Sequence, residues 1–356
     1  MLSKFINLKS FNIKKNKKTI QKKLKFLIKE KNQLNQSLSQ TYQDKYDLKK
    51  IKGKKNFRLI GMGGSVLGSQ AIFNFLKKKI NKKFLFFINL NSFQKLDKKE
   101  KFTNLIVSKS GNTLETILNA NILINKKDEN IFITENKSSY LLNLAHKLKA
   151  EIVYHNNFIG GRYSVLSEVG MLPAELMGLN PKKFRQFNNI VKNKKFLNLL
   201  IKNTAAILHY SKKKKYNSII INYDHKSNYL FQWYQQLVAE SLGKKGKGIL
   251  PIISTMPKDN HSVMQLYLDG FKNNFFTFFS CKEKDSNSLN KASLLNTHKK
   301  MGSYNLNDII LKQKNATENV FTNKNIPFRS FEISKRNEEV LGELFCYFIL
   351  ETILLG

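Results

Sequence analysis

Residues 108–113, with the sequence SKSGNT, place three hydroxyl side chains and a glycine close together. An apolar run at 105–107 precedes them, and apolar residues at helical spacing follow over 114–122. The glycine permits a tight backbone turn, and the free amides and dipole at the start of a helix favour an anion. We therefore predict that this segment binds a phosphate group.

A second glycine-rich turn, GMGGS at 61–65, also lies between an apolar run and a helical segment. A Walker A loop would have Lys and then Ser or Thr after Gly68, but Ser69 and Gln70 stand there. A dinucleotide-binding turn would be followed by an acidic residue about twenty positions later, but no Asp or Glu occurs between Asp47 and Asp97. The turn is thus interpreted as a second loop for the same phosphorylated ligand. A purely structural tight turn is the alternative.

A carboxylate is presented by the helical segment 227–243. Trp233, Gln236 and Glu240 are spaced by three and four residues, so they share one stripe of the helix. Glu240 is therefore a candidate general base. The alternative is a surface ion pair with Lys244, one helical turn further on.

Two further residues are candidates for chemistry. Arg162, in GGRYS at 160–164, is one of only five arginines among 62 basic residues, and its planar guanidinium holds two oxygens in a way that lysine cannot copy. His261 follows the turn PKDN at 257–260. Seen alone, a histidine in a loop is usually only solvated.

Short apolar runs alternate with helical segments, which predicts an α/β protein with doubly wound parallel sheets covered on both faces. The predicted strands are 57–60, 84–89, 104–107, 130–134 and 151–154, and then, after a restart near residue 190, 218–222, 248–254, 274–281 and 328–333. Both glycine-rich turns fall at the carboxyl ends of strands, where such sheets bind ligands. We divide the chain into a helical leader (1–52), a first subdomain (53–185) and a second subdomain (186–356).

The formal net charge of +37 would ordinarily favour a polyanionic partner. The excess of lysine extends along the whole chain, however, and no RNA- or DNA-binding motif is present, so we expect no nucleic-acid partner. There is no apolar run of about 18 residues, so we expect no membrane association. Cys281 and Cys346 stand alone, which indicates neither a disulfide framework nor a metal site. We expect a reducing, cytoplasmic location.

Five segments, in order, resemble the phosphoglucose isomerase family, which has the sugar isomerase (SIS) fold. They are 60–68, 108–116, 160–164, 236–241 and 261–265, and the similarity extends from about residue 57 onwards. The resemblance implies two flavodoxin-like αβα sandwich subdomains with parallel sheets. It also implies interconversion of glucose 6-phosphate and fructose 6-phosphate through a cis-enediol, without a metal or an organic cofactor.

The resemblance further implies a role for each candidate residue. Glu240 would be the general base, Arg162 would stabilise the enediolate, and His261 would assist ring opening from the partner subunit of a homodimer. The remaining candidates would bind the phosphate and the sugar; they are Gly64, Ser65, Ser108, Lys109, Ser110, Thr113, Gly161 and Gln236.

One departure from the family and two alternatives remain. In the family, a lysine beyond the last helix helps to open the sugar ring, and no residue up to Gly356 matches it. We therefore expect reduced rather than zero activity. The alternatives are a non-catalytic or weakly active SIS protein that binds sugar phosphates, and a bifunctional phosphoglucose/phosphomannose isomerase. Glu240, Arg162 and His261 count against the first, and residues 108–113 do not decide the second.

Overall fold

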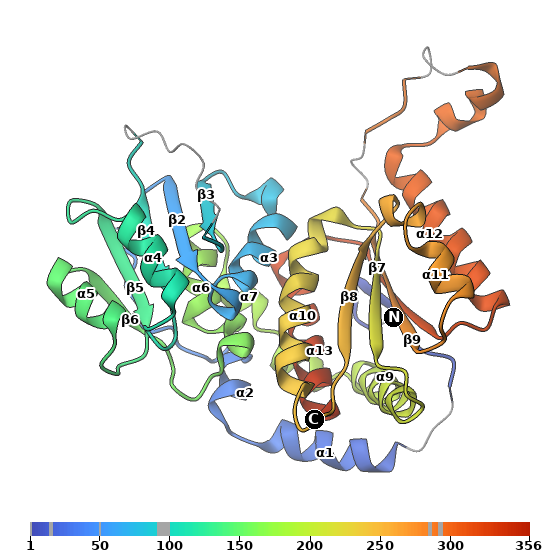
Figure 1. Ribbon diagram of the computed structural model, residues 1–356, viewed down its shortest axis with the longest axis horizontal. Helices are drawn as coiled ribbons and strands as arrows, with labels where there is room; N and C mark the ends of the chain where they lie inside the picture. The colour runs from blue at the N-terminus through green and yellow to red at the C-terminus, as the bar shows by residue number, and fades with distance from the viewer. Residues whose placement is uncertain (1, 14–16, 50, 91–99, 284–286, 291–294) are drawn as a thin grey trace.

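The computed structural model describes residues 2–13, 17–49, 51–90, 100–283, 287–290 and 295–356. Two five-stranded sheets lie side by side, with helices between them and around them (Figure 1). The first sheet is built from the green and blue half of the chain, and the second mainly from the yellow and red half.

The first sheet has the strand order β3-β2-β4-β5-β6, and all its neighbouring strands are parallel. Its strands are β2 (Asn56–Gly61), β3 (Lys83–Phe87), β4 (Thr103–Val107), β5 (Glu129–Thr134) and β6 (Glu151–Tyr154). Strand β4 is buried at every position, as a central strand covered on both faces must be. Helices α3 (Leu67–Phe75), α4 (Leu114–Leu123) and α5 (Tyr140–Leu148) connect the strands.

The second sheet has the order β1-β10-β9-β7-β8. Its strands are β1 (Ile6–Lys9), β7 (Asn217–Asn222), β8 (Leu250–Thr255), β9 (Asn274–Cys281) and β10 (Phe328–Ile333). Strands β7 to β10 are parallel, whereas β1 pairs antiparallel with β10, Ile6 opposite Ile333. The order β8-β7-β9-β10 therefore repeats the order β3-β2-β4-β5 of the first sheet. Strand β1 takes the edge position that β6 has in the first sheet.

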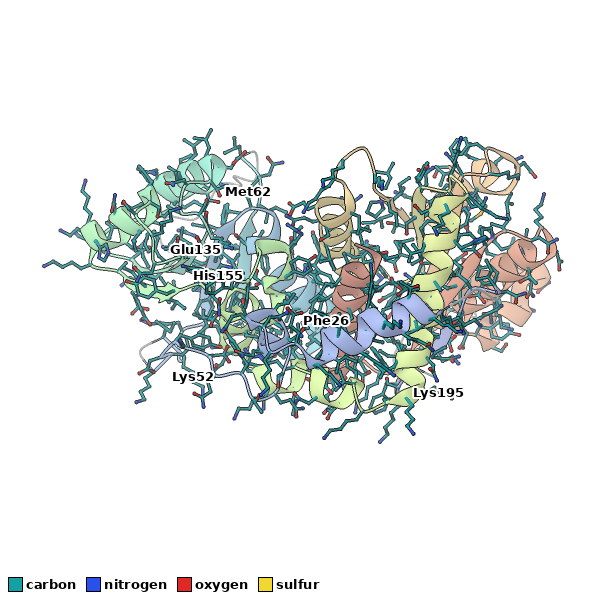
Figure 2. The ribbon with its side chains drawn as sticks, turned by 90° about the horizontal axis from the view of Figure 1, so that it is seen from below. Phe26, Lys52, Met62, Glu135, His155 and Lys195 are labelled. Carbon is teal, nitrogen blue, oxygen red and sulfur yellow. The ribbon has the colours of Figure 1, made fainter. Side chains whose placement is uncertain are left out.

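Three helices pack between the sheets, namely α3, α10 (Asn228–Leu242) and α13 (Glu338–Leu355). The other helices are α1 (Lys18–Lys29), α2 (Gln33–Ser37), α6 (Glu168–Leu176), α7 (Pro181–Phe184), α8 (Phe187–Ile190), α9 (Lys194–Lys212), α11 (Met264–Asp269) and α12 (Leu306–Asn323). Helix α1 crosses below α9 and α13, and its Phe26 is 72% exposed (Figure 2).

Helix α13 is part of the core that both halves share. Its Gly342 is required by packing, because a Cβ there would lie 1.9 Å from the carbonyl oxygen of Phe184 in α7. Glu351 of α13 forms a fully buried ion pair with Arg329 of β10, with Nη2 and Oε2 2.9 Å apart. Each of these charges needs the other, since loss of one partner leaves an uncompensated charge in the interior.

All nine strands predicted from the sequence are present, with ends within two residues of the prediction. Within residues 1–52 the structure contains α1 and α2, and also β1, which the expected helical leader did not include. Strand β1 has only four residues, alternately buried and exposed, which is too short a pattern to identify by periodicity. Among the described residues, no helix combines the length and apolar character needed to cross a membrane.

Candidate active site

The carboxyl edge of the first sheet and the last turns of α10 line an open cavity of about 370 Å³. Nine residues predicted from the sequence line it together: Gly64, Ser65, Lys109, Ser110, Thr113, Gly161, Arg162, Gln236 and Glu240. They come from four separate segments of the chain. The structure therefore unites in one cavity the predicted phosphate loop, the predicted base and the predicted arginine.

The phosphate loop, residues 108–113, turns from β4 into α4. Gly111 has a φ of +66°, and a Cβ there would lie 2.1 Å from the hydroxyl oxygen of Ser139, so glycine is required. Ser110 and Thr113 line the cavity, whereas Ser108 is buried behind it, with its Oγ 2.9 Å from Thr113 Oγ1. Thr113 is the N-cap of α4, and no side chain caps this helix, so its first amides remain available to an anion.

The loop after β2 packs directly against the other walls of the cavity. Gly63 has a φ of +51°, and a Cβ there would lie 2.8 Å from Gln236 Nε2. A Cβ on Gly64 would lie 2.4 Å from the carbonyl oxygen of Gly161. Because neither glycine has a side chain, the segment that carries Arg162 and the helix that carries Glu240 can pack close to the first sheet.

Glu240 lies between a guanidinium and an amide. Gln236 Nε2 donates a hydrogen bond to Glu240 Oε1 at 2.8 Å, and Arg162 Nη1 lies 3.3 Å from Glu240 Oε2. Ser241 holds the arginine by accepting a hydrogen bond from its Nε at 2.8 Å. The Glu240 side chain is still 49% exposed, so its carboxylate is open to a ligand in the cavity. It pairs with Arg162 from a distant segment rather than with the sequence neighbour Lys244.

Sequence reasoning missed two lining residues, Met62 and Glu135. Glu135 directly follows β5, and its Oε1 lies 3.2 Å from Lys109 Nζ, which also donates to the carbonyl oxygen of Asn157 at 3.1 Å. Glu135 thus offsets the lysine charge and fixes its position in the phosphate loop. Its place after a strand parallel to β4 was the signal that could have identified it.

His155 lies directly after β6, beside the strand end that carries Glu135 (Figure 2). It is 3% exposed, and neither ring nitrogen has a hydrogen-bond partner among the described residues. Burial, together with the positive charge of Lys109, lowers the pKa of His155 to about 4. The ring is therefore neutral at physiological pH and adds no charge near the phosphate loop.

Besides Ser108, two other residues singled out in the sequence do not line this cavity. His261 is exposed and is not among the residues that line the cavity in its own chain, so its role stays a prediction. Trp233 shares its stripe of α10 with Gln236 and Glu240, as the spacing predicted, but it lies nearer the start of the helix and does not line the cavity. It is buried, with its ring 4.7 Å from that of Phe345, because the face of α10 toward α13 must be apolar.

The cavity offers hydroxyls, amides, two cations and two carboxylates, a set suited to an anion that also carries hydroxyl groups. Within the described part of the chain, no group of three or more His, Cys, Asp or Glu side chains is arranged to hold a metal ion.

Comparison of the sequence with known proteins identifies the family. The sequence model of the family "Phosphoglucose isomerase" matches residues 17–250. A glucose-6-phosphate isomerase of Methanocaldococcus jannaschii is 34% identical over 336 residues, which cover 88% of this chain and 80% of that protein. A glucose-6-phosphate isomerase of Campylobacter jejuni is 30% identical, over 85% of this chain and 79% of the relative.

Solved structures share the fold. A hypothetical protein from Thermus thermophilus superposes with a TM-score of 0.81 at 19% identity, over 96% of this chain and 88% of that one. A glucose-6-phosphate isomerase from Chlamydia trachomatis gives a TM-score of 0.69 at 17% identity, over 91% and 73% of the two chains. The family model and the relatives show that the chain belongs to the phosphoglucose isomerase family, whose activity is the interconversion of glucose 6-phosphate and fructose 6-phosphate.

Proposed function

We propose that the 370 Å³ cavity is where this chain interconverts glucose 6-phosphate and fructose 6-phosphate, with Glu240 as the general base. One observation carries the proposal. Glu240 and Arg162 face the same cavity as the hydroxyls of the phosphate loop, so a sugar held by its phosphate extends toward a carboxylate and a guanidinium.

The phosphate would be bound by the hydroxyls of Ser110 and Thr113 and by the first amides of α4. Charge-assisted hydrogen bonds of this kind are short and strong. Lys109 adds one positive charge, which Glu135 offsets through the ion pair at 3.2 Å. Because this end of the ligand is held by backbone and short side chains, it fixes the sugar carbons relative to α10.

Glu240 would remove the proton from C2 of the open-chain aldose and return it to C1, while the hydroxyl proton of O2 passes to O1, so that the carbonyl group moves from C1 to C2. The intermediate cis-enediolate carries negative charge on its oxygens. Arg162, held by Ser241, is placed to stabilise that charge. Gln236 donates a hydrogen bond through its amide nitrogen to Glu240 and so helps to orient the carboxylate.

The proposal includes a homodimer in the cytoplasm, as the family resemblance implies, with His261 of one subunit completing the site of the other. A mixture of Glu240→Gln and His261→Asn chains tests this. Each variant alone lacks one group, but a mixed dimer contains one intact site. Random mixing then recovers about a quarter of the wild-type rate. If His261 acts within its own chain, the mixture stays inactive.

The activity itself is tested by adding glucose 6-phosphate in D2O and following fructose 6-phosphate and deuterium uptake at the reacting carbons by NMR. We expect ketose formation together with solvent exchange, since Glu240 is half exposed. Binding of the sugar phosphate without ketose formation or exchange would favour the non-catalytic alternative. Comparison of the rates with glucose and mannose 6-phosphates decides whether the enzyme is bifunctional.

A further inference from the structure

A second cavity, of about 290 Å³, lies at the carboxyl ends of β9 and β10, where the second sheet meets the end of α3. Phe75, Leu76 and Cys281 form its apolar wall. Seven cations also line it: Lys77, Lys78, Lys79, Lys226, Lys282, Lys335 and Arg336. The isomerase site described above uses none of these residues.

The position of this cavity repeats that of the phosphate site. The order β8-β7-β9-β10 matches β3-β2-β4-β5, so β7, β9 and β10 correspond to β2, β4 and β5. The phosphate site is lined by residues that follow β2, β4 and β5. The second cavity is lined by Lys226 after β7, by Lys282 and Glu283 after β9, and by residues 334–336 after β10. It therefore occupies the ligand-binding edge of the second sheet.

Four of the seven cations already have carboxylate partners. Arg336 binds both oxygens of Asp224, at 2.9 and 2.6 Å, and its Nε donates to Glu283 at 3.1 Å. Lys226 also pairs with Glu283, at 2.8 Å. The remaining two pairs join Lys79 to Glu338 and Lys282 to Glu332.

Three cations at the cavity, Lys77, Lys78 and Lys335, have no carboxylate partner within the described residues. Lys77 and Lys335 lie over the rings of Phe73 and Phe5, which leaves their charge unneutralised. Lysines are frequent all over this chain, but here three without a carboxylate partner line one concave surface that has an apolar wall. Such a site lowers the free energy of a bound anion more than scattered surface charges do.

This cavity is separate from the isomerase site. Helices α3 and α10 pack side by side and extend from one site to the other. Lys226 precedes the first turn of α10 and Glu240 lies in its last turn, which places about 18 Å of helix between the two sites. A ligand bound at one site therefore does not touch the other.

We propose that this second cavity binds a small organic phosphate ester. Its dianionic phosphate would lie among Lys77, Lys78 and Lys335, and its organic part would pack on Phe75 and Leu76. Lysines suit a compact, multiply charged phosphate group, which needs no planar fork. The volume equals that of about ten water molecules, so the ligand is a small molecule rather than a polymer.

Phenyl phosphate is the probe for a calorimetric titration at pH 8 and constant ionic strength. The background is Ser110→Ala/Thr113→Val, which weakens binding at the isomerase site. On this background we expect one phenyl phosphate per chain. The added pair Lys78→Gln/Lys335→Gln should weaken its binding at least tenfold. The matched control is Lys22→Gln/Lys25→Gln, which removes the same charge from exposed positions on α1 and should change the affinity less than twofold.

The proposal is overturned if the background variant binds no phenyl phosphate, or if the α1 control weakens binding as much as the pair in the cavity does. The second result would mean that net charge, and not the cavity, attracts the anion. Both variants alter only exposed lysines, and equal thermal midpoints will show that they are folded. Because the readout is binding on a background impaired at the isomerase site, the result is independent of the proposed isomerase mechanism.

Discussion

Replacement of Glu240 by glutamine removes the proposed base with little change in shape. Glutamine keeps a carbonyl oxygen that can accept the hydrogen bond from Gln236 Nε2, now 2.8 Å from Glu240 Oε1, and it cannot accept a proton from carbon. The pair with Arg162, at 3.3 Å, becomes a neutral contact. The phosphate loop is untouched, since it belongs to a different segment of the chain.

The expected effects on turnover and on binding differ in size. Loss of a positioned general base costs about 10²- to 10⁴-fold in kcat, or about 3 to 5 kcal/mol of transition-state stabilisation. Loss of a half-exposed ion pair costs at most about 1 kcal/mol. We therefore expect kcat to fall at least about 100-fold, whereas the affinity for an unreactive ligand changes less than about fivefold.

The assay combines two measurements on the same protein. NMR follows conversion of fructose 6-phosphate, and calorimetry measures binding of sorbitol 6-phosphate, which has no carbonyl group and cannot react. Glu339→Gln, an exposed change of the same kind in the first turn of α13, is the control and should leave both values unchanged. If turnover and affinity fall by the same factor in Glu240→Gln, Glu240 is a binding residue and the proposed mechanism is wrong.

Three more outcomes are expected. Ser110→Ala and Thr113→Val should each raise KM about tenfold or more, with a smaller effect on kcat, because each removes one hydrogen bond to a charged phosphate; steady-state kinetics measures this. Gly64→Ala should lower the free energy of unfolding by about 1 to 3 kcal/mol and reduce activity, because its Cβ would meet the Gly161 carbonyl at 2.4 Å. Gly161→Ala, which has nothing within 4 Å of its Cβ, is the control in urea unfolding. His155 has a pKa of about 4 in the folded chain, below the value near 6.5 expected when it is unfolded, so the unfolded state binds more protons between these values. Stability should thus fall by about 2 kcal/mol from pH 7 to pH 5 on account of His155, and His155→Phe should lack this part of the slope.

The strands could be predicted because each is a short run apolar on both faces between turn residues, which is what a covered parallel sheet requires. Strand β1 could not, because its partner β10 lies more than 300 residues further on and its own four residues carry little pattern. The choice of partner strand depends on tertiary packing, about which a short stretch of sequence carries no information.

The site was partly visible in the sequence for a similar reason. The phosphate loop can be identified from the sequence, because its glycine, its hydroxyls and its flanking strand and helix are consecutive. Glu135 has no such local signature. It becomes part of the site only because β5 lies beside β4 and brings its carboxylate to Lys109. Trp233 shares a helix stripe with Gln236 and Glu240 but packs against Phe345, so spacing alone does not tell which residues of a stripe reach the cavity.

The pairing of β1 with β10 sets an order for folding during synthesis on the ribosome. The first sheet uses residues 56–154 only, so it can form before β10 is made, whereas β1 is made before β10 and must wait for residues 328–333 to pair. At about 5 to 20 residues per second, this wait lasts roughly 15 to 60 s. During that time the side chains of Ile6 and Leu8, which are buried in the folded protein, are available to chaperones, and closure of the second sheet must follow the synthesis of β10.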